Sequence, residues 1–232
     1  MTMPSETNTI VFLVGLGAPI DLYSDLIKNI RELIPHEAFH VLQWWNQDDF
    51  GKNELNRYLK NTNAILIGHS AGGSIAIQAL ADAPDVVRRV VMFDSHTLKG
   101  IKPLPSIEKF LDILLSPGSA EVINKVRNAY LQLVKDSTAF DRALEFLSLW
   151  VKNNLPEVCS KIKAMQDHTV LHMGFTNSQY QVLDAEHENE LKNFWGQYNI
   201  DTQFLPMSHF DLITPSRAKL IAQKISSWLS ET

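Results

Sequence analysis

Residues 64–78 read A-I-L-I-G-H-S-A-G-G-S-I-A-I-Q. An apolar run typical of a buried strand breaks at Gly68, and helical spacing of apolar residues begins directly after Ser70. This order predicts a nucleophile elbow, a strand–turn–helix unit in which a strained serine presents its hydroxyl above the sheet edge. Gly68 and Gly72 flank the serine because a Cβ at either position would collide where strand and helix pass closely. The amide of Ala71 and the positive end of the new helix face the same space, which suits a developing oxyanion.

The composition of the chain limits the class of protein to which this serine can belong. The 232 residues are 45% hydrophobic, enough for one domain that spans residues 1–232 with an ample core. A net charge of −5 without runs of like charge argues against nucleic acid and anionic membranes as partners. The single cysteine excludes an intrachain disulfide, and no apolar stretch approaches the ~18 residues of a membrane span. The first eight residues lack the apolar core of a secretory signal, so we expect a cytoplasmic protein.

Strand-like and helix-like segments alternate through most of the chain. Apolar runs typical of buried strands occupy residues 9–14, 39–44, 64–67, 89–93, 169–173 and 201–205. Such alternation predicts the α/β class, with a mostly parallel sheet and helices on both of its faces. Ligands of such sheets lie at the carboxyl ends of the strands. Gly15, Ser70 and Asp94 each follow a strand, so we expect them to converge on one rim.

The alternation stops between about residues 98 and 165. Proline-punctuated segments near 106–115, 120–135 and 138–153 show helical apolar stripes instead. Because this segment follows a strand end on the predicted rim, we expect a mobile helical lid that lines the substrate channel.

A serine hydroxyl needs a base to accept its proton, and that base needs an orienting acid. His209 lies in a loop after the last strand, where the order Ser, acid, His places the base. His69 adjoins the serine on a sharp turn, so its ring should point away from the hydroxyl, and we interpret it as a structural neighbour. The remaining histidines flank strands or lie in a predicted interior strand or a charged helix: His36, His40, His96, His168, His172 and His187.

The acid has two candidates. Asp94 ends the strand that follows the elbow helix, on the same rim as Ser70. The alternative is one strand later, where the loop at residues 174–178 holds no acid and the next carboxylate is Asp184. Asp184 opens a charge-rich stretch typical of a solvated helix start, so we favour Asp94.

Four motifs in the same order resemble the thioesterases of polyketide and nonribosomal peptide assembly lines, which have the α/β-hydrolase fold. The resemblance covers nearly the whole chain and includes the helical lid. The glycine-rich loop resembles the family's oxyanion loop and its following tyrosine, although Gly15 stands where proline or histidine is usual. The matching segments are Gly15-Leu16-Gly17-Ala18 with Tyr23, Gly68–Gly73, Met92-Phe93-Asp94-Ser95 and Ser208-His209-Phe210-Asp211.

This resemblance implies an acyl or peptidyl thioester, carried on the phosphopantetheine arm of a carrier protein, and no metal or organic cofactor. Ser70 would attack the carbonyl, His209 would take its proton, and Asp94 would orient the imidazole. The amides of Leu16 and Ala71 would bind the oxyanion. Hydrolysis and cyclisation both fit.

Three alternatives stay open. An editing (type II) thioesterase is one, because the chain shows no carrier-protein or condensation segment. A carboxylesterase or lipase with the same triad is another, and a binding or scaffold protein without turnover is the third.

Overall fold

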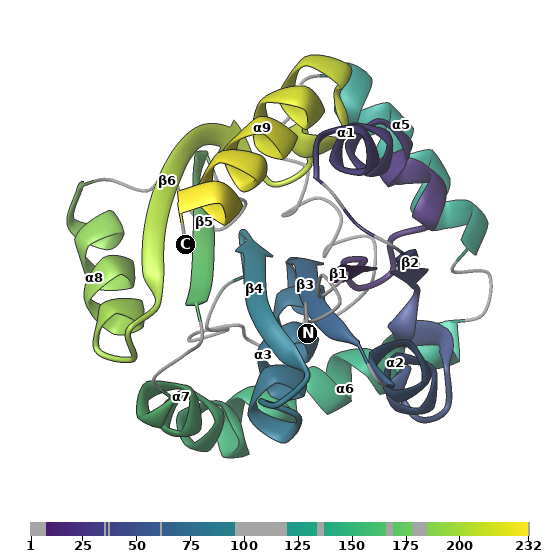
Figure 1. Cartoon of the computed structure of the whole chain (residues 1–232). Coiled ribbons are helices and arrows are strands. Elements are labelled where there is room, and N and C mark those ends of the chain that lie inside the picture. Colours follow the sequence, from purple (N-terminus) through teal and green to yellow (C-terminus); the bar gives the residue numbers. More distant parts are fainter. Residues whose placement is uncertain are drawn as a thin grey trace.

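The computed structural model describes residues 8–34, 36, 38–60, 62–95, 120–133, 137–165, 169–177 and 185–231. Within them, six parallel strands form one sheet in the order β2-β1-β3-β4-β5-β6 (Figure 1). The parallel sheet confirms the predicted α/β class. The strands are β1 (Asn8–Leu13), β2 (Ala38–Leu42), β3 (Asn63–His69), β4 (Val87–Phe93), β5 (Thr169–Asn177) and β6 (Asp201–Ser208).

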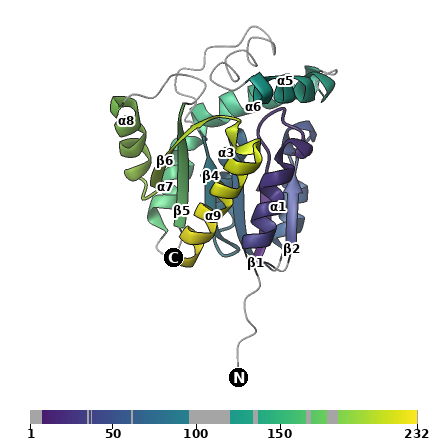
Figure 2. The same ribbon diagram turned by 90° about the horizontal axis from the view of Figure 1, so that it is seen from above.

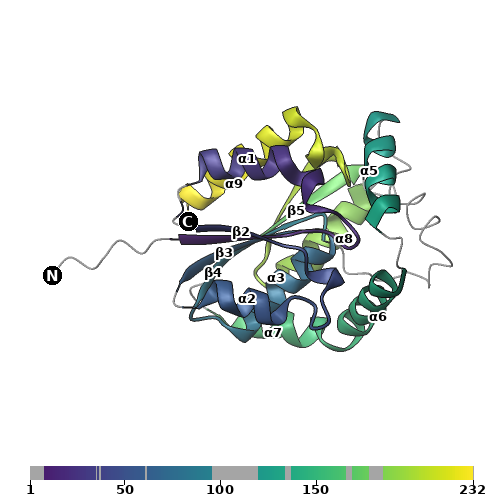
Figure 3. The ribbon, with the colours of Figure 1, turned by 90° about the vertical axis from the view of Figure 1, so that its right-hand side faces the viewer.

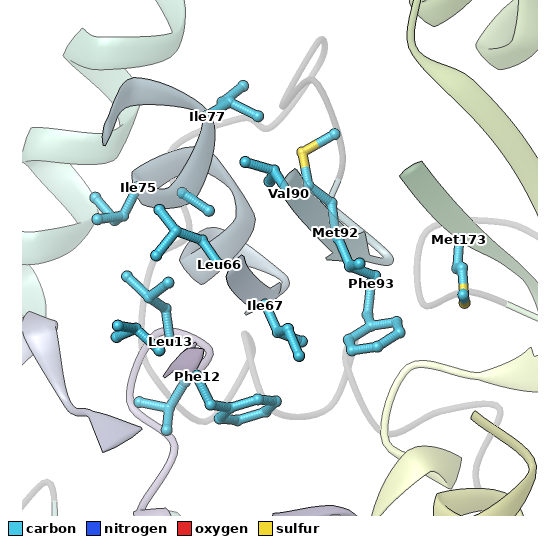
Figure 4. Close-up of a cluster of buried hydrophobic side chains, with 14 of the residues drawn as sticks. Phe12, Leu13, Leu66, Ile67, Ile75, Ile77, Val90, Met92, Phe93 and Met173 are labelled. Carbon is cyan, nitrogen blue, oxygen red and sulfur yellow. The ribbon is translucent and has the colours of Figure 1, made fainter. Parts of the chain in front are cut away.

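The central strands are apolar because both faces of the sheet are covered. β1 pairs with β3 so that Ile10 lies beside Ile65 and Phe12 beside Ile67, and all four side chains are buried. Figure 4 shows side chains of β1, β3, β4 and β5 from this core together with those of α3 (Ala71–Asp82), which contacts β1, β3 and β4. This packing fixes the ends of the strands, and with them the rim that carries the predicted site.

Helices cover both faces of the sheet (Figure 3). On one face, α1 (Ser24–Leu33) packs beside α9 (Pro215–Glu231). The other face carries α2 (Lys52–Leu59), α3 and α7 (Leu155–Ala164), while α8 (Ala185–Gly196) packs on β6. The described residues also form three short 3₁₀ helices: η1 (Ile20–Tyr23), η2 (Trp44–Asn46) and η3 (Asp211–Ile213).

Two further helices, α5 (Ala120–Leu133) and α6 (Ser137–Asn153), lie at the carboxyl ends of the strands (Figure 2). They belong to the segment expected to form a lid. α7, which the same segment also included, packs against α3 on the sheet face instead. The helix expected near 106–115 lies outside the described residues.

Several strand ends differ from the sequence prediction. β3 continues through Gly68 to His69, and β5 continues to Asn177, through most of the loop expected at residues 174–178. β2 stops at Leu42, and the following tryptophans form η2, where the Trp44 indole N–H donates to the Val14 carbonyl at 2.8 Å. β6 continues through Pro206 to Ser208, a stretch expected to be a loop. An edge strand tolerates proline because one of its two sides forms no ladder hydrogen bonds, and β6 is the edge.

Candidate active site

Ser70 occupies the turn between β3 and α3 with φ 54° and ψ −124°. A positive φ is rare for a residue with a side chain, and such strain persists only where the surroundings hold it. Here the Ser70 amide donates to the Phe93 carbonyl at 2.8 Å, and the Ser70 carbonyl accepts from the Gly73 amide at 3.0 Å. The serine side chain is partly exposed. The turn thus has the strained geometry of a nucleophile elbow.

The two glycines that flank Ser70 permit the tight crossing of strand and helix. A Cβ on Gly68 would lie 2.5 Å from the carbonyl carbon and oxygen of Gly72. One on Gly72 would lie 2.4 Å from the Leu13 carbonyl oxygen. Both contacts are with backbone, which cannot yield as a flexible side chain can, so no larger residue fits. This is the collision expected from the sequence.

Asp94 and His209 meet in a buried pair. His209 Nδ1 lies 2.6 Å from Asp94 Oδ2, and their side chains are 1% and 0% exposed. Asp94 Oδ1 accepts a hydrogen bond from the Phe175 amide at 3.2 Å. With the Nδ1 proton directed at the carboxylate, His209 Nε2 is left to accept a proton. Asp184, the alternative acid, lies outside the described residues.

A short, packed loop carries His209 directly after β6. The Ser208 amide donates to the Asp211 carboxylate at 2.8 Å, which closes the loop before η3. Phe210 is 2% exposed and packs edge-on against the His209 ring, with centroids 4.8 Å apart. The imidazole is therefore held by backbone turns and aromatic packing as well as by Asp94.

The glycine-rich loop after β1 lies against the elbow. A Cβ on Gly15 would lie 3.5 Å from the Ser70 Cβ and 3.1 Å from His69 Nδ1. This crowding explains why glycine suits a position at which the resembling family has proline or histidine. Neither the Leu16 amide nor the Ala71 amide donates a hydrogen bond to any residue that the structure describes. Ala71 also begins α3, whose positive end favours negative charge.

His69 has a larger part in the site than the sequence indicated. Its ring is fully buried, and Nδ1 lies 2.8 Å from the Tyr23 hydroxyl. Its Nε2 lies 3.1 Å from the His209 carbonyl oxygen, and the two histidine rings have centroids 4.4 Å apart. Neither motif spacing nor periodicity signals these contacts.

The other histidines have different surroundings. His36 Nδ1 bonds the Ile34 carbonyl at 2.7 Å, and His40 stacks on Tyr58. His172 is buried beside Trp195. His96, His168 and the side chain of His187 lie outside the described residues.

Comparison with known proteins agrees with this geometry. Residues 45–224 match the family model described as alpha/beta hydrolase fold. The chain belongs to the α/β-hydrolase fold family. No curated protein sequence matches it.

Solved structures of several hydrolases resemble this α/β hydrolase at low sequence identity, which shows the shared fold. An enol-lactonase from Burkholderia xenovorans LB400 has a TM-score of 0.69 and 14% identity, covering 97% of this chain and 92% of that one. A thermophilic esterase has a TM-score of 0.62 and 16% identity, covering 96% and 89%. A thioesterase domain from the curacin biosynthetic pathway has a TM-score of 0.59 and 15% identity, covering 95% and 91%.

The described residues contain no helix that is both long and apolar enough to cross a membrane. Nor do they contain a group of three or more His, Cys, Asp or Glu residues placed to hold a metal ion.

Proposed function

We propose that this α/β hydrolase is a serine thioesterase that releases an acyl or peptidyl chain from a carrier-protein phosphopantetheine arm. The observation that carries the proposal is the buried Asp94–His209 pair, in which Asp94 directly follows Phe93, the residue whose carbonyl accepts the amide hydrogen bond of the strained Ser70. The four motifs that resemble assembly-line thioesterases support the thioester assignment, and so does the curacin thioesterase domain among the similar structures. A carrier-bound substrate is also compatible with the cytoplasmic location expected from the sequence.

In the first half-reaction Ser70 Oγ attacks the thioester carbonyl carbon while His209 Nε2 takes the hydroxyl proton. Asp94 stabilises the imidazolium through its 2.6 Å contact with Nδ1. The carbonyl oxygen gains negative charge and is bound by the amides of Leu16 and Ala71, each contributing on the order of 3 kcal/mol to the transition state. The C–S bond then breaks, and His209 returns the proton to the leaving thiolate.

In the second half-reaction a nucleophile attacks the acyl–Ser70 ester. Water gives a free acid, while an amine or hydroxyl of the chain itself gives a ring. His209 again takes the proton of the nucleophile, and the same two amides bind the oxyanion. The bond between the acyl carbon and Ser70 Oγ then breaks, and His209 returns the proton to Oγ. The scheme uses no metal or organic cofactor.

Two other activities fit the same residues. The enol-lactonase and the esterase among the similar structures favour an ordinary carboxylic ester as the alternative substrate. Editing thioesterase activity, in which short stalled acyl groups are removed from the carrier, is the other alternative.

The test compares three substrates: a long acyl chain on a holo carrier protein, an acetyl group on the same carrier, and an aryl ester of the long chain. We expect kcat/KM to be highest for the long-chain carrier thioester. Preference for the acetyl carrier would indicate editing, and preference for the aryl ester would overturn the thioesterase assignment. Ser70→Ala is the matched control, because it should abolish turnover of all three.

A further inference from the structure

The acyl-transfer scheme leaves two buried polar side chains of the site without a role, Tyr23 and His69. Both are 0% exposed. They lie in a continuous series of hydrogen bonds: the Gly15 amide to the Tyr23 oxygen at 3.1 Å, the Tyr23 hydroxyl to His69 Nδ1 at 2.8 Å, and His69 Nε2 to the His209 carbonyl at 3.1 Å.

The proton positions in this series follow from its two ends. The Gly15 amide can only donate, so the Tyr23 oxygen accepts from it. The His209 carbonyl can only accept, so His69 Nε2 carries a proton. The Tyr23 hydroxyl then donates to a bare His69 Nδ1, and every N–H and O–H in the series has an acceptor. Burial raises the pKa of Tyr23, which keeps the hydroxyl protonated as this direction requires.

One end of the series lies beside a candidate oxyanion donor, and the other end lies on the residue that supplies the base. Gly15 directly precedes Leu16, whose amide is a candidate oxyanion donor. At the other end, the His209 carbonyl belongs to the residue that supplies the base. Ser70 lies next to this series, because it directly follows His69 and because a Cβ on Gly15 would lie 3.5 Å from the Ser70 Cβ. A shift of either end would change the geometry around the nucleophile.

We propose that Tyr23 and His69 act as one positioning unit that holds the oxyanion loop and the backbone of His209 at a fixed separation across Ser70. The inference rests on the proposed acyl-transfer function, but it holds for any acyl substrate. The Asp94 carboxylate holds the imidazole of His209, and the His69 ring holds the backbone carbonyl of His209. In this role both residues act through the backbone of Gly15 and His209.

The test uses variants of both residues on the full chain. Tyr23→Phe removes the shared hydroxyl with little change of shape. His69→Leu removes both ring partners, whereas His69→Gln keeps an acceptor oxygen and a donor N–H with a spacing similar to that of the ring nitrogens. Tyr58→Phe is the matched control, because Tyr58 bonds Glu54 on α2 and has no part in the proposed site.

The primary readout is the second-order rate constant with which a fluorophosphonate labels Ser70, because labelling needs the base and the oxyanion donors but no knowledge of the substrate. We expect Tyr23→Phe and His69→Leu to lower this rate constant by about 10- to 100-fold, because misplacing reacting groups by about 1 Å can cost up to about 100-fold in rate. His69→Gln should recover part of this loss, and Tyr58→Phe should match the wild type. With an aryl ester, kcat should fall in the same order and KM should change little.

Nitrogen-15 NMR supplies a readout that a loss of stability would not move. In the wild type, His69 should show a protonated Nε2 and a bare Nδ1, and the His209 Nδ1 proton should resonate far downfield. Tyr23→Phe should shift both signals in the folded protein. If labelling per folded molecule stays within twofold of the wild type in both Tyr23→Phe and His69→Leu, the positioning unit is wrong. If only carrier thioesters fail to react while labelling follows the expected order, the thioesterase assignment fails and the positioning unit stands.

Discussion

Replacing Asp94 by asparagine tests whether Asp94 is the acid that orients His209, because the substitution replaces one carboxylate oxygen by an NH₂ group. In the native site the two carboxylate oxygens accept from different donors, the His209 Nδ1–H at 2.6 Å and the Phe175 amide at 3.2 Å. An asparagine amide has only one oxygen. Its NH₂ group must therefore face one of these two donors.

The Phe175 backbone N–H decides which orientation of the asparagine side-chain amide is preferred. If the amide oxygen turns to His209, the NH₂ group faces the Phe175 N–H, and leaving that buried donor unpaired costs about 1–3 kcal/mol, a bias of roughly 5- to 150-fold. In the opposite orientation the NH₂ group donates to His209 Nδ1, which moves the imidazole proton to Nε2. A histidine in that tautomer has no lone pair for the serine proton. Most molecules therefore hold an inactive tautomer.

The tautomer bias accounts for up to about 150-fold, and loss of the carboxylate charge that stabilises the imidazolium accounts for the rest. We therefore expect Asp94→Asn to lower the acylation rate by about 10⁴-fold, equivalent to about 5.4 kcal/mol in activation free energy. Single-turnover measurement of acyl–Ser70 formation keeps product release from masking this step. Asp184→Asn should stay near the wild type, and so should Asp201→Asn at the exposed start of β6. A large loss at Asp184 with little at Asp94 would refute the assignment, moving the acid one strand later and favouring the editing thioesterases.

Three further predictions concern the nucleophile, the elbow and the lid. Ser70→Ala should lower kcat by about 10⁶-fold and abolish fluorophosphonate labelling while circular dichroism stays native; turnover at the wild-type rate would overturn the whole site. Gly68→Ala places a Cβ 2.5 Å from backbone atoms and should lower stability by about 3 kcal/mol and Tm by about 6–12 °C. Gly196→Ala is its control, since a Cβ there meets no atom within 4 Å, and equal Tm values would contradict the steric argument. Amides of α5 should exchange hydrogen faster than those of β3, whereas equal protection would count against a mobile lid.

The sheet and the elbow could be predicted because their causes are local. Apolar runs that must be buried on both faces predict strands of a parallel sheet, and β1, β3 and β4 lie where such runs occur. The end of β6 was mispredicted because proline is normally a strand breaker, and only the place of β6 at the sheet edge makes Pro206 acceptable.

The contacts of His69 were beyond sequence reasoning for a different reason. Its two ring nitrogens bond groups that are 46 and 140 positions away in the chain. The sequence indicates only that a histidine on this turn points away from the serine hydroxyl. What it points toward depends on how η1 and the loop after β6 pack around β3, which no local pattern encodes.

The packing of α5 connects this helix to two loops of the candidate site. The Tyr130 hydroxyl donates to the Leu16 carbonyl at 2.7 Å, and its ring packs edge-on against Phe210, the residue after His209. Gly17 has φ 72°, and a Cβ there would lie 2.7 Å from Tyr130 Cε1. The helix that covers the rim therefore contacts both the loop of the candidate oxyanion donor and the loop of the candidate base. A substitution in α5 that alters acyl-chain preference should also alter kcat, because neither loop can keep its place when Tyr130 moves.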